Sequence, residues 1–597
     1  MNGQLCRIDL TQSKVTTEDI PSKVLETFIG GKGLGAYYLY NEMDPTLDPL
    51  DPRSTFVLAT GPAQGILPIA GRYCIVAKSP HSGIFIDSHV GGFLGPELRF
   101  AGYNAILVTG RAKHPVVIRV IDSEVTIEDA EDLWGRMTLD TEDELKRRYG
   151  QKTRIISIGP AAENGVSFAS TTSDYYRTAA RGGIGLLLAS KNLKAIAVRG
   201  TKKIDIPEVV KLVSRDINMR AKESKLKGHL LPVQGTSWLV EIASARDQLP
   251  TENYSSGEWE NATAIGGGAI EEKYRERIHP KPCYKCSLAC SFVIDTEWSE
   301  RPVQHPEYES LGLLGSNLGI SDLDTLLKLN HRCNELGMDT ISTGSTISWY
   351  IESCRRGIIP EKYADEYLSF GDGEGVLELV ERIAYKQGIG EILSGGVKRA
   401  SELLGGEEWA VHVRGLELPA WDPRGKLGLG LSYITSNVGG SHLRGWPSTS
   451  DFPNRSALDV IDSLIEQQDL KILKDSLIMC HFTHSIRPAL SIEDTARIFE
   501  SLTGIPTTAE DMRMRAQAIW ILCRQFNVKV WGDQSPRDGD YLPYRLMRDP
   551  LPSGAAKGCT SFVSDDDLEA SLDLFYSKRK CDKDGRPLDK ELSKLGL

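Results

Sequence analysis

Three cysteines lie close together in the stretch PCYKCSLAC: Cys283, Cys286 and Cys290. Thiolates at this spacing can reach one metal centre, so the stretch is a candidate zinc site, redox disulfide or [4Fe–4S] cluster site. Structural zinc sites usually combine two separated pairs of ligands, and the sequence has no second Cys-x2-Cys and no nearby His-x3–5-His pair. A disulfide needs only two cysteines. The spacing favours a cluster, with zinc and unrelated free thiols as alternatives.

Spacing alone does not identify the fourth ligand that such a cluster needs. Four cysteines elsewhere in the chain are candidates for it: Cys333, Cys354, Cys480 and Cys523.

Other stretches combine glycines with arginines. They are AGRYCIVAKSP with Arg72, SHVGGFLGPELRFAGYNAI, and RTAARGGIG with Arg177 and Arg181. Glycine lets the backbone approach a ligand closely, and the arginine fork suits phosphate. Together they predict a grip on a phosphorylated cofactor, although each arginine alone is typical of a surface turn. GGKGLGAYYLY lacks the phosphate-loop pattern and is interpreted as a turn that leads into a helix.

Two stretches carry groups that could move protons near a substrate. HPEYESLGLLGSN contains Glu307 and Glu309, and SNVGGSHLRGW contains His442 and Arg444. A buried carboxylate or imidazole is suited to general acid–base work. The alternatives are a solvated glutamate and a hydrogen-bonded loop histidine.

Two aspartates follow helix-like segments beside apolar residues: Asp339 in ELGMDTIS and Asp475 in LKDSLIMCHF. Singly, each is best interpreted as a helix-end aspartate facing water. A buried aspartate needs hydrogen-bond partners, and both could accept bonds from the amino-pyrimidine end of a pterin. Cys480 lies five residues after Asp475, which would link a thiolate with a pterin contact.

The bulk properties limit the class of protein. A chain of 597 residues is expected to form two to four domains. Its net charge of −11 and the absence of a long basic run argue against nucleic acid as a partner. We find no apolar run long enough for a membrane span and no secretory signal, so we expect a cytoplasmic protein.

The elements that must position these groups change in type along the chain. We expect an α+β protein with a β-rich domain over residues 1–205 and two mainly helical domains over residues 206–415 and 416–597. Short apolar segments next to glycine, such as FVLATGPAQG and AILVTGRA, predict the strands. Periodic apolar residues predict a helix from Asp322, with Ser321 as its N-cap. Further helices are expected over residues 207–227, 457–474 and 511–526.

These motifs together resemble the aldehyde ferredoxin oxidoreductase family of tungsten enzymes. They occur in the family's order between residues 30 and about 482, which makes the resemblance specific. The motifs are GGKGLGAYYLY, AGRYCIVAKSP, GGFLGPELRFAGYNAI, RTAARGGIG, PCYKCSLAC, PEYESLGLLGSN, LGMDTIS, DPRG–TSN–GGSHLRG and DSLIMCHF.

The resemblance implies a fold and a set of cofactors. The N-terminal β-domain forms a base for a metal–bis-pyranopterin cofactor, and two helical domains cover it. The metal is tungsten, with molybdenum as the alternative, and it typically has no protein ligand. A Mg²⁺ ion bridges the two pterin phosphates, and a [4Fe–4S] cluster lies close by.

The resemblance also implies roles for single residues. The cluster ligands are Cys283, Cys286, Cys290 and Cys480. Glu309 and His442 lie beside the metal, as general base and as acid or hydrogen-bond donor. The cofactor-binding residues are Arg72, His89, Gly91, Arg177, Thr178, Ala180, Arg181, Asp339, Thr340, Arg444, Asp475 and Met479.

The sequence departs from the family pattern at several positions. His89 stands where many relatives have Asn, and the contact there is largely through the backbone carbonyl. Ile478 and Met479 replace a Gly-Leu pair, and Arg444 stands where some relatives have Lys. None of these changes removes a cluster ligand or a pterin aspartate.

The implied reaction is the oxidation of an aldehyde to a carboxylic acid, with electrons passing through the cluster to ferredoxin or a ferredoxin-like iron–sulfur subunit. Homodimers and hetero-oligomers both occur in the family. One alternative is the catalytic subunit of a benzoyl-CoA-reductase-like complex that works reductively on an aryl-CoA. A second is an electron-transfer subunit with a cluster alone, and a third is a zinc-binding helical protein.

Overall fold

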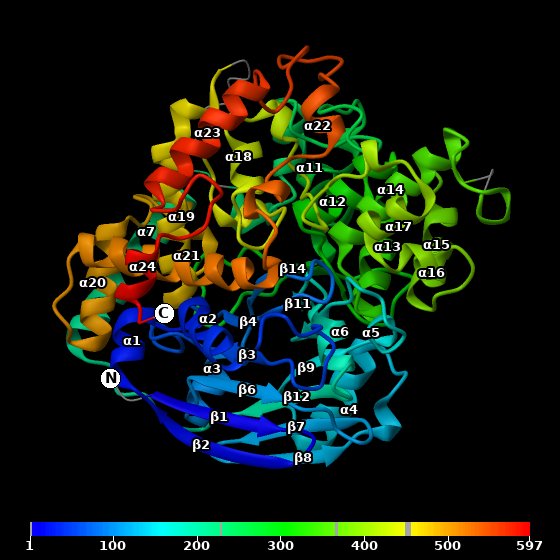
Figure 1. Ribbon diagram of the computed structural model, residues 1–597. Helices are drawn as coiled ribbons and strands as arrows, with labels where there is room; N and C mark the ends of the chain where they lie inside the picture. The colour runs from blue at the N-terminus through cyan, green and yellow to red at the C-terminus, as the bar shows by residue number, and fades with distance from the viewer. Residues whose placement is uncertain (1–2, 227, 229, 365–367, 448–454, 597) are drawn as a thin grey trace.

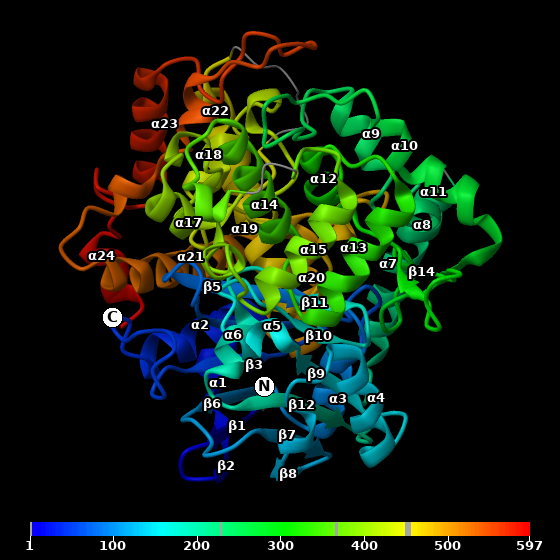
Figure 2. The ribbon, with the colours of Figure 1, turned by 90° about the vertical axis from the view of Figure 1, so that its right-hand side faces the viewer.

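The computed structural model of the chain describes residues 3–226, 228, 230–364, 368–447 and 455–596. A β-rich N-terminal part forms the base of the molecule in Figure 1, and the helices of the later chain stand above it. Figure 2 shows the same division from the side. The expected α+β fold with a β-rich first domain and helical domains after it is confirmed. None of the described helices is both long and apolar enough to cross a membrane.

The first sheet has six strands in the order β2-β1-β6-β3-β4-β5. Its central strand β3 is buried at every residue, which explains its uninterrupted apolar sequence FVLA. β1 and β6 run parallel and the other neighbours run antiparallel. The bounds of the strands are β1 Gly3–Asp9, β2 Lys14–Ile20, β3 Phe56–Ala59, β4 Tyr73–Lys78, β5 Phe85–Val90 and β6 Ala105–Thr109.

The second sheet also has six strands, in the order β11-β10-β9-β12-β7-β8. β9 and β12 are the expected strands around Ile155 and Ala195. Helix α3 (Leu94–Ala101) contacts β7, β9 and β12. The bounds of the strands are β7 Val116–Ile121, β8 Glu124–Asp129, β9 Arg154–Ile158, β10 Thr171–Ser173, β11 Arg177–Ala179 and β12 Leu193–Arg199.

The two sheets meet where their edge strands β5 and β11 contact each other. The hydroxyl of Ser88 on β5 donates to the carbonyl oxygen of Ala180, just after β11, at 2.8 Å. This contact brings the glycine–arginine stretches around Gly91 and Arg177 side by side, although they are far apart in the sequence. The base of the site is therefore the seam between the two sheets.

GGKGLGAYYLY forms helix α2 (Gly31–Glu42), as expected of a turn that leads into a helix. Its glycines serve close backbone packing. A Cβ atom on Gly31, which has φ +41°, would lie 2.3 Å from the carbonyl oxygen of Asp475, and one on Gly30 would lie 3.0 Å from that of Ser476. The start of α2 therefore packs directly against the end of helix α19 (Ile461–Leu477), where one of the two expected pterin aspartates lies.

The expected helices of the later chain are present. The helix predicted from Asp322 begins one residue later, and Asp322 itself caps it by accepting a hydrogen bond from Thr325 N. The assignment of Ser321 as the N-cap was therefore wrong, because the aspartate carboxylate takes that bond. The longer helices are α7 Glu208–Leu226, α13 Leu323–Leu336, α14 Thr340–Arg355, α15 Gly373–Ala384, α17 Gly396–Leu404, α19 Ile461–Leu477, α20 Ile492–Thr503, α21 Ala509–Trp531 and α23 Asp565–Lys578.

A buried ion pair joins the middle and last parts of the chain. Arg545 in α22 (Tyr544–Arg548) contacts both carboxylate oxygens of Glu352 in α14 at 2.6 Å, and Asn253 donates to the same carboxylate. Such a pair is strongly destabilising when one partner is removed, because a charge is left buried and unpaired. It joins the two helical parts near the C-terminal end of α14, whereas Asp339 lies at the N-terminal end of that helix.

The packing of α2 against α19 makes a testable prediction. Gly31→Ala places a methyl group into the Asp475 carbonyl, so we expect a loss of about 2–4 kcal/mol and a melting temperature several degrees lower. Gly165→Ala is the matched control, because Gly165 also has a positive φ (+85°) but no atom within 4 Å of an added Cβ. Its loss should be only about 1 kcal/mol. Equal melting temperatures for the two variants would show that the close contact does not matter.

Candidate active site

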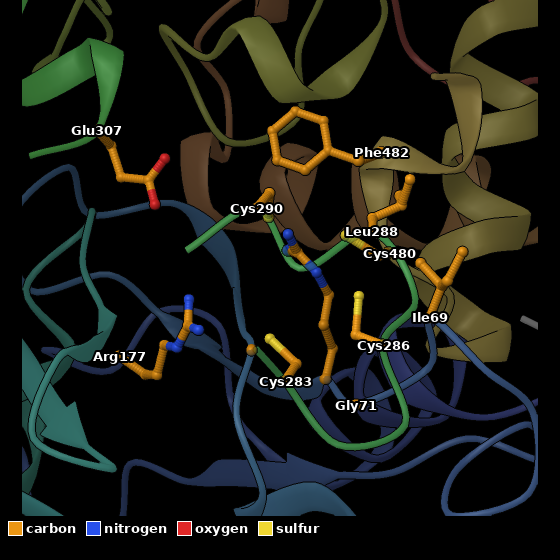
Figure 3. A pocket seen from close by; sticks show the side chains of 12 residues that line it. Ile69, Gly71, Arg177, Cys283, Cys286, Leu288, Cys290, Glu307, Cys480 and Phe482 are labelled. Atoms are coloured by element: carbon orange, nitrogen blue, oxygen red, sulfur yellow. The ribbon is translucent and has the colours of Figure 1, made fainter. Parts of the chain in front are cut away.

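All four expected cluster ligands line one cavity of about 160 Å³. Figure 3 shows Cys283, Cys286 and Cys290 on one loop, with Cys480 beside them from a different part of the chain. Cys333 and Cys523 are buried elsewhere in the core and do not line this cavity. Figure 3 shows Arg177 and Glu307 on one side of the same cavity and Ile69, Leu288 and Phe482 on the other. Arg72 also lines it.

The cysteine loop lies directly on the seam of the β-rich base. A Cβ atom on Gly91 would lie 2.8 Å from the Sγ atom of Cys283, and one on Gly71 would lie 3.1 Å from the backbone nitrogen of Tyr284. The Cys480 backbone N–H donates to the carbonyl oxygen of Ile69 at 2.9 Å. Glycine is needed at both contact points because the sulfur and the main chain come so close.

Two of these thiols, Cys286 and Cys290, ionise with difficulty unless a cation lies close to them. Burial, followed by the nearby Cys283 and Cys480, raises the pKa of the Cys286 thiol to about 12. Burial also raises the pKa of Cys290 well above its ordinary value. Four cysteines crowded in one buried cavity fit a metal centre, which supplies the positive charge that stabilises thiolates. Both zinc and a [4Fe–4S] cluster accept such a donor set.

A second group of side chains surrounds Asp475, five residues before Cys480. Lys471 donates to Asp475, and His89 Nε2 and Arg444 Nη1 lie 3.7 and 3.6 Å from Asp475 Oδ2. Burial opposes ionisation of this carboxyl, but His89, Lys471 and Arg444 outweigh it and lower its pKa. Asp475 is therefore a buried carboxylate, and the interpretation of it as an aspartate facing water is wrong.

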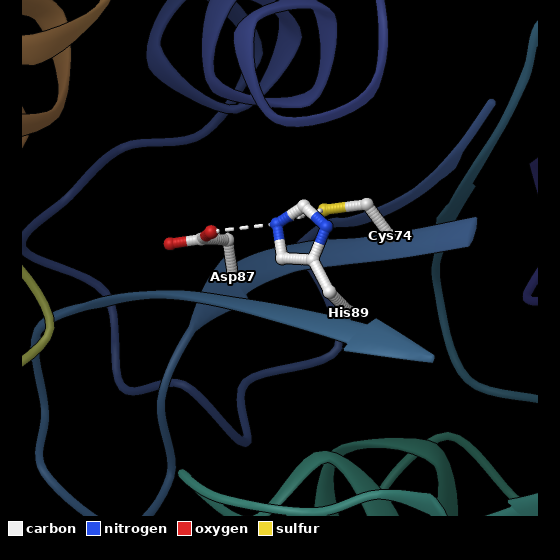
Figure 4. Close-up of side chains that lie close together, drawn as sticks. All are labelled: Cys74, Asp87 and His89. Atoms are coloured by element: carbon white, nitrogen blue, oxygen red, sulfur yellow. Dashed lines mark hydrogen bonds and ion pairs between the residues drawn. The ribbon is translucent and has the colours of Figure 1, made fainter. Parts of the chain in front are cut away.

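Asp87 is the carboxylate that the basic side chains of this group surround. Lys32 Nζ lies 3.0 Å from Asp87 Oδ1, and Arg444 Nη1 and His89 Nε2 each lie 2.8 Å from Oδ2. Figure 4 shows Asp87 and His89 on β5, with Cys74 on the neighbouring strand β4. Although the three ligand types suit a metal, we interpret them as a charge network, because two cations already neutralise the carboxylate.

A third group surrounds Asp339, which lies between α13 and α14 and caps the latter. Its Oδ1 atom accepts from Ile341 N at 3.1 Å, and Arg181 Nε lies 3.8 Å from Oδ2. Its side chain is buried, so it too does not face water. Burial raises the pKa of this carboxyl, while Arg181 opposes the change.

Glu309 and His442 lie together, as a proton-transferring pair should. His442 Nε2 is 3.4 Å from Glu309 Oε1, and Glu309 Oε2 accepts from the Ala420 backbone N–H at 2.7 Å. Burial raises the pKa of Glu309 to about 7. Burial, followed by Arg181 and Arg444, lowers the pKa of His442 to about 3. At neutral pH the imidazole is uncharged and the carboxyl is divided between its two forms, which suits a general base.

The side chains of Glu309 and His442 are 18% and 19% accessible, so neither is completely enclosed by protein atoms.

Several buried polar atoms of these groups have no hydrogen-bond partner within the part of the chain that the structure describes. They are Glu309 Oε1, His89 Nδ1, Arg181 Nη1, Arg444 Nε and Asp475 Oδ2. Unsatisfied buried polar atoms are costly, so their concentration here fits a polar ligand that both donates and accepts hydrogen bonds and carries negative charge. A pterin with a phosphate has these properties.

The structure separates the expected cofactor residues into two places. Arg72, Gly91 and Arg177 line the cysteine cavity, whereas Arg181 and Arg444 lie at Asp339 and Asp475. Arg72 Nη1 also donates to the carbonyl oxygen of His89 at 3.4 Å, which joins the two places. The rest occupy neighbouring backbone or side-chain positions: Thr178 in β11, Ala180 bonded to Ser88, Thr340 bonded to Ser310, and buried Met479.

Sequence reasoning did not identify Lys32, Asp87, Lys471 and Glu417, all of which contact site residues. A signal existed for two of them. Asp87 precedes His89 by two residues on a strand, so both point to one face. Lys471 precedes Asp475 by four residues on a helix and lies over the same face.

At Ile478 the chain adopts a left-handed conformation, with φ +64°. This is the position where the family pattern has Gly, which reaches that conformation without strain. A branched residue there is held by its surroundings, since Ile478 is fully buried and packs against Gly31.

Comparison with known proteins agrees with this geometry. Residues 5–200 match the family described as aldehyde ferredoxin oxidoreductase, N-terminal domain, and residues 212–597 match its domains 2 and 3. The chain is 37% identical to a tungsten-containing aldehyde ferredoxin oxidoreductase of Pyrococcus furiosus, over 100% of this chain and 98% of the relative. It is 29% identical to the WOR-like subunit of an aliphatic sulfonate oxidoreductase of the same organism, over 100% and 97%.

A solved structure shares the fold. The active-site complex of a benzoyl coenzyme A reductase with bound 1,5-dienoyl-CoA contains a chain that superimposes with a TM-score of 0.87 at 22% identity, covering 100% of this chain and 98% of that one.

The raised pKa of Glu309 makes the stability of the cofactor-free protein depend on pH. Glutamate in an unfolded chain ionises near pH 4.5, but folded Glu309 keeps its proton up to about pH 7. Wild-type stability therefore falls as the pH rises through this range, by at most about 3 kcal/mol. The glutamine in the Glu309→Gln variant stays neutral at every pH. The melting temperature of the variant relative to that of the wild type should therefore increase as the pH rises from 4.5 to 8. A difference that does not change with pH would refute the raised pKa.

Proposed function

Because the chain belongs to the aldehyde ferredoxin oxidoreductase family, we propose that it is a tungsten–pterin enzyme that oxidises aldehydes to carboxylic acids. The proposed electron acceptor is ferredoxin or a ferredoxin-like iron–sulfur subunit. The observation that carries the proposal is the Glu309–His442 pair, which lies beside two aspartate–arginine groups. In these groups Arg181 Nη1, Arg444 Nε and Asp475 Oδ2 have no hydrogen-bond partner among the described residues.

The proposed cofactor positions follow these groups. Asp339 with Arg181 would hold one pterin, and Asp475 with Arg444 the other. Phosphate groups and the Mg²⁺ ion that bridges them would lie at the seam between the sheets, near His89 and Ala180. The four cysteines would hold a [4Fe–4S] cluster.

The cluster position supports a path for electrons out of the protein. The helix and loop from Asp475 to Cys480 join a proposed pterin contact to a proposed cluster ligand within six residues. On the other side, Lys285 and Ser287 are exposed within the cysteine loop itself. An electron carrier that docks on this loop comes close to the cluster without entering the protein. Eleven cysteines in 597 residues are too few for a disulfide scaffold, which suits the reducing cytoplasm that we propose as its location.

A bound tungsten–pterin cofactor would supply the two-electron redox change, and the protein residues would transfer the protons. An aldehyde and a water molecule give a carboxylic acid, two protons and two electrons. Glu309, held by Ala420, takes a proton from the attacking water when its carboxyl is ionised. His442 Nε2 lies 3.4 Å from Glu309 Oε1, and the imidazole stays neutral. A ring N–H of His442 donates a hydrogen bond to the carbonyl oxygen of the aldehyde and so orients it. Arg181, which carries positive charge nearby, stabilises the ionised form of Glu309.

Metal analysis and substrate assays on anaerobically purified protein test the function. We expect tungsten, about four irons per chain and reduction of a viologen dye with short and aromatic aldehydes. Turnover of an aryl-CoA or an aliphatic sulfonate, with no aldehyde activity, would overturn the substrate class. Iron without tungsten or molybdenum would support a protein with a cluster alone, and zinc would exclude the cluster.

The role of Glu309 is tested by the Glu309→Gln variant. This variant should keep both metals and lose turnover at least about 100-fold. Full activity would show that Glu309 is not the general base.

The fourth cluster ligand is tested separately. Cys480→Ser should lower the iron content and bleach visible absorption, because Cys480 shares a cavity with the other three cysteines. Cys523→Ser is the matched control, since Cys523 is fully buried in α21, outside that cavity. Bleaching by the control, with an unchanged Cys480→Ser protein, would contradict the assignment.

A further inference from the structure

A buried chain of hydrogen bonds leads from the β-rich base to Asp339. His81, in the loop after β4, lies 2.8 Å through Nε2 from Glu417 Oε2, and both side chains are almost wholly buried. The Ser342 hydroxyl lies 2.7 Å from that same oxygen and 3.1 Å from Asp339 Oδ2. Ser167 Oγ contacts the other ring nitrogen of His81 at 2.9 Å.

The hydrogen atoms available along this series of side chains determine which hydrogen bonds form. Ser342 has one hydroxyl hydrogen and stands between two carboxylates, so it donates to only one of them at a time. Although burial alone would raise it, His81 lowers the pKa of Glu417 to about 2, and Glu417 is ionised. Glu417 receives hydrogen bonds from His81 and from the Val397 backbone N–H at 3.0 Å. The Ser342 hydroxyl is the contact that the two carboxyls share, at 2.7 Å from Glu417 and 3.1 Å from Asp339, so it links their positions whichever of them accepts its hydrogen.

The same residue also fixes the arginine that faces Asp339. The backbone carbonyl of Glu417, in β17 (Leu416–Glu417), accepts a hydrogen bond from Arg181 Nη2, and the carbonyl oxygen of Gly440 accepts a second at 3.0 Å. Arg181 is thereby oriented with Nε toward Asp339 and with Nη1 unpartnered among the described residues. Glu417 thus positions Asp339 through its side chain and Arg181 through its main chain.

Space for the ion pair is provided by a glycine. A Cβ atom on Gly396, which has φ +81°, would lie 2.3 Å from Cε1 of His81 and 2.8 Å from Glu417 Oε1. His412, which pairs with Glu417 across the two-stranded sheet, has its pKa lowered to about 4 by burial and carries no charge at neutral pH. His81, Gly396 and Glu417 pack together here although they are far apart in the sequence.

We propose that His81 and Glu417 are positioning residues that hold Asp339 in place through Ser342, and Arg181 through the main chain of Glu417, for binding one of the two pterins. This inference rests on the proposed tungsten–pterin function. A buried ion pair is weak evidence for stability alone, since apolar residues often serve as well. Its bonds instead converge on two groups that face the cofactor space, as supporting residues around a bound metal commonly do.

The test measures how fast purified holoenzyme loses tungsten and pterin during anaerobic dialysis. Glu417→Gln and Ser342→Ala should each accelerate the loss about tenfold. If they act through Asp339, neither should accelerate the loss further in an Asp339→Asn background. Wild-type release rates in both single variants, or effects that add to that of Asp339→Asn, would overturn the inference.

Glu352→Gln is the matched control for general loosening of the protein. Glu352 is a buried carboxylate that also joins two parts of the chain, but its partners are Arg545 and Asn253. The control should lower the melting temperature and leave the release rate unchanged. Equal acceleration by Glu352→Gln would show that any broken interface releases the cofactor, and the specific role of Glu417 would be rejected. Wild-type protein without tungsten or pterin would instead refute the proposed function.

Discussion

The contact between the start of α2 and the end of α19 holds the two halves of the site together. Gly30 and Gly31 approach the carbonyl oxygens of Ser476 and Asp475 so closely that no side chain fits between them. The Asp475 side chain and the Cys480 thiol extend from this segment in a fixed relation to the β-rich base. A shift of the segment would move a proposed pterin contact and a proposed cluster ligand at once, so both depend on this packing.

Charge balance is the second constraint on the site. Around Asp475 and Asp87, cations lie within 4 Å of each carboxylate. Around Asp339 a single arginine lies within 4 Å, and the nearby Glu417 carboxylate opposes ionisation instead of assisting it. Buried charges are tolerated only when they are paired or hydrogen-bonded. The two aspartates thus differ: burial dominates at Asp339 and raises its pKa, whereas the surrounding cations dominate at Asp475 and lower it. The two proposed pterin contacts are not electrically equivalent.

Sequence patterns predicted most of the architecture because strands and helices depend on local periodicity. Glycine turns marked β3 and β6, and apolar spacing marked α13 and α19. Motif resemblance predicted which cysteine joins the loop at Cys283, which spacing alone left open among four. Long-range partners could not be predicted: nothing near His81 in the sequence points to Glu417, more than 300 residues later. The choice of Asp322 over Ser321 as a helix cap likewise depends on side-chain geometry, which the pattern does not contain.

The strand seam, the cysteine loop, Asp339, the Glu417 strand and Cys480 occur in that order along the chain. During synthesis the β-rich base emerges first, and the last cysteine of the cavity emerges with only about a fifth of the chain still to be made. The β-rich base of the cavity is therefore complete long before the helical segments that enclose it have been synthesised. A cofactor held by the proposed residues can therefore be completely enclosed only after the last helical part has been synthesised.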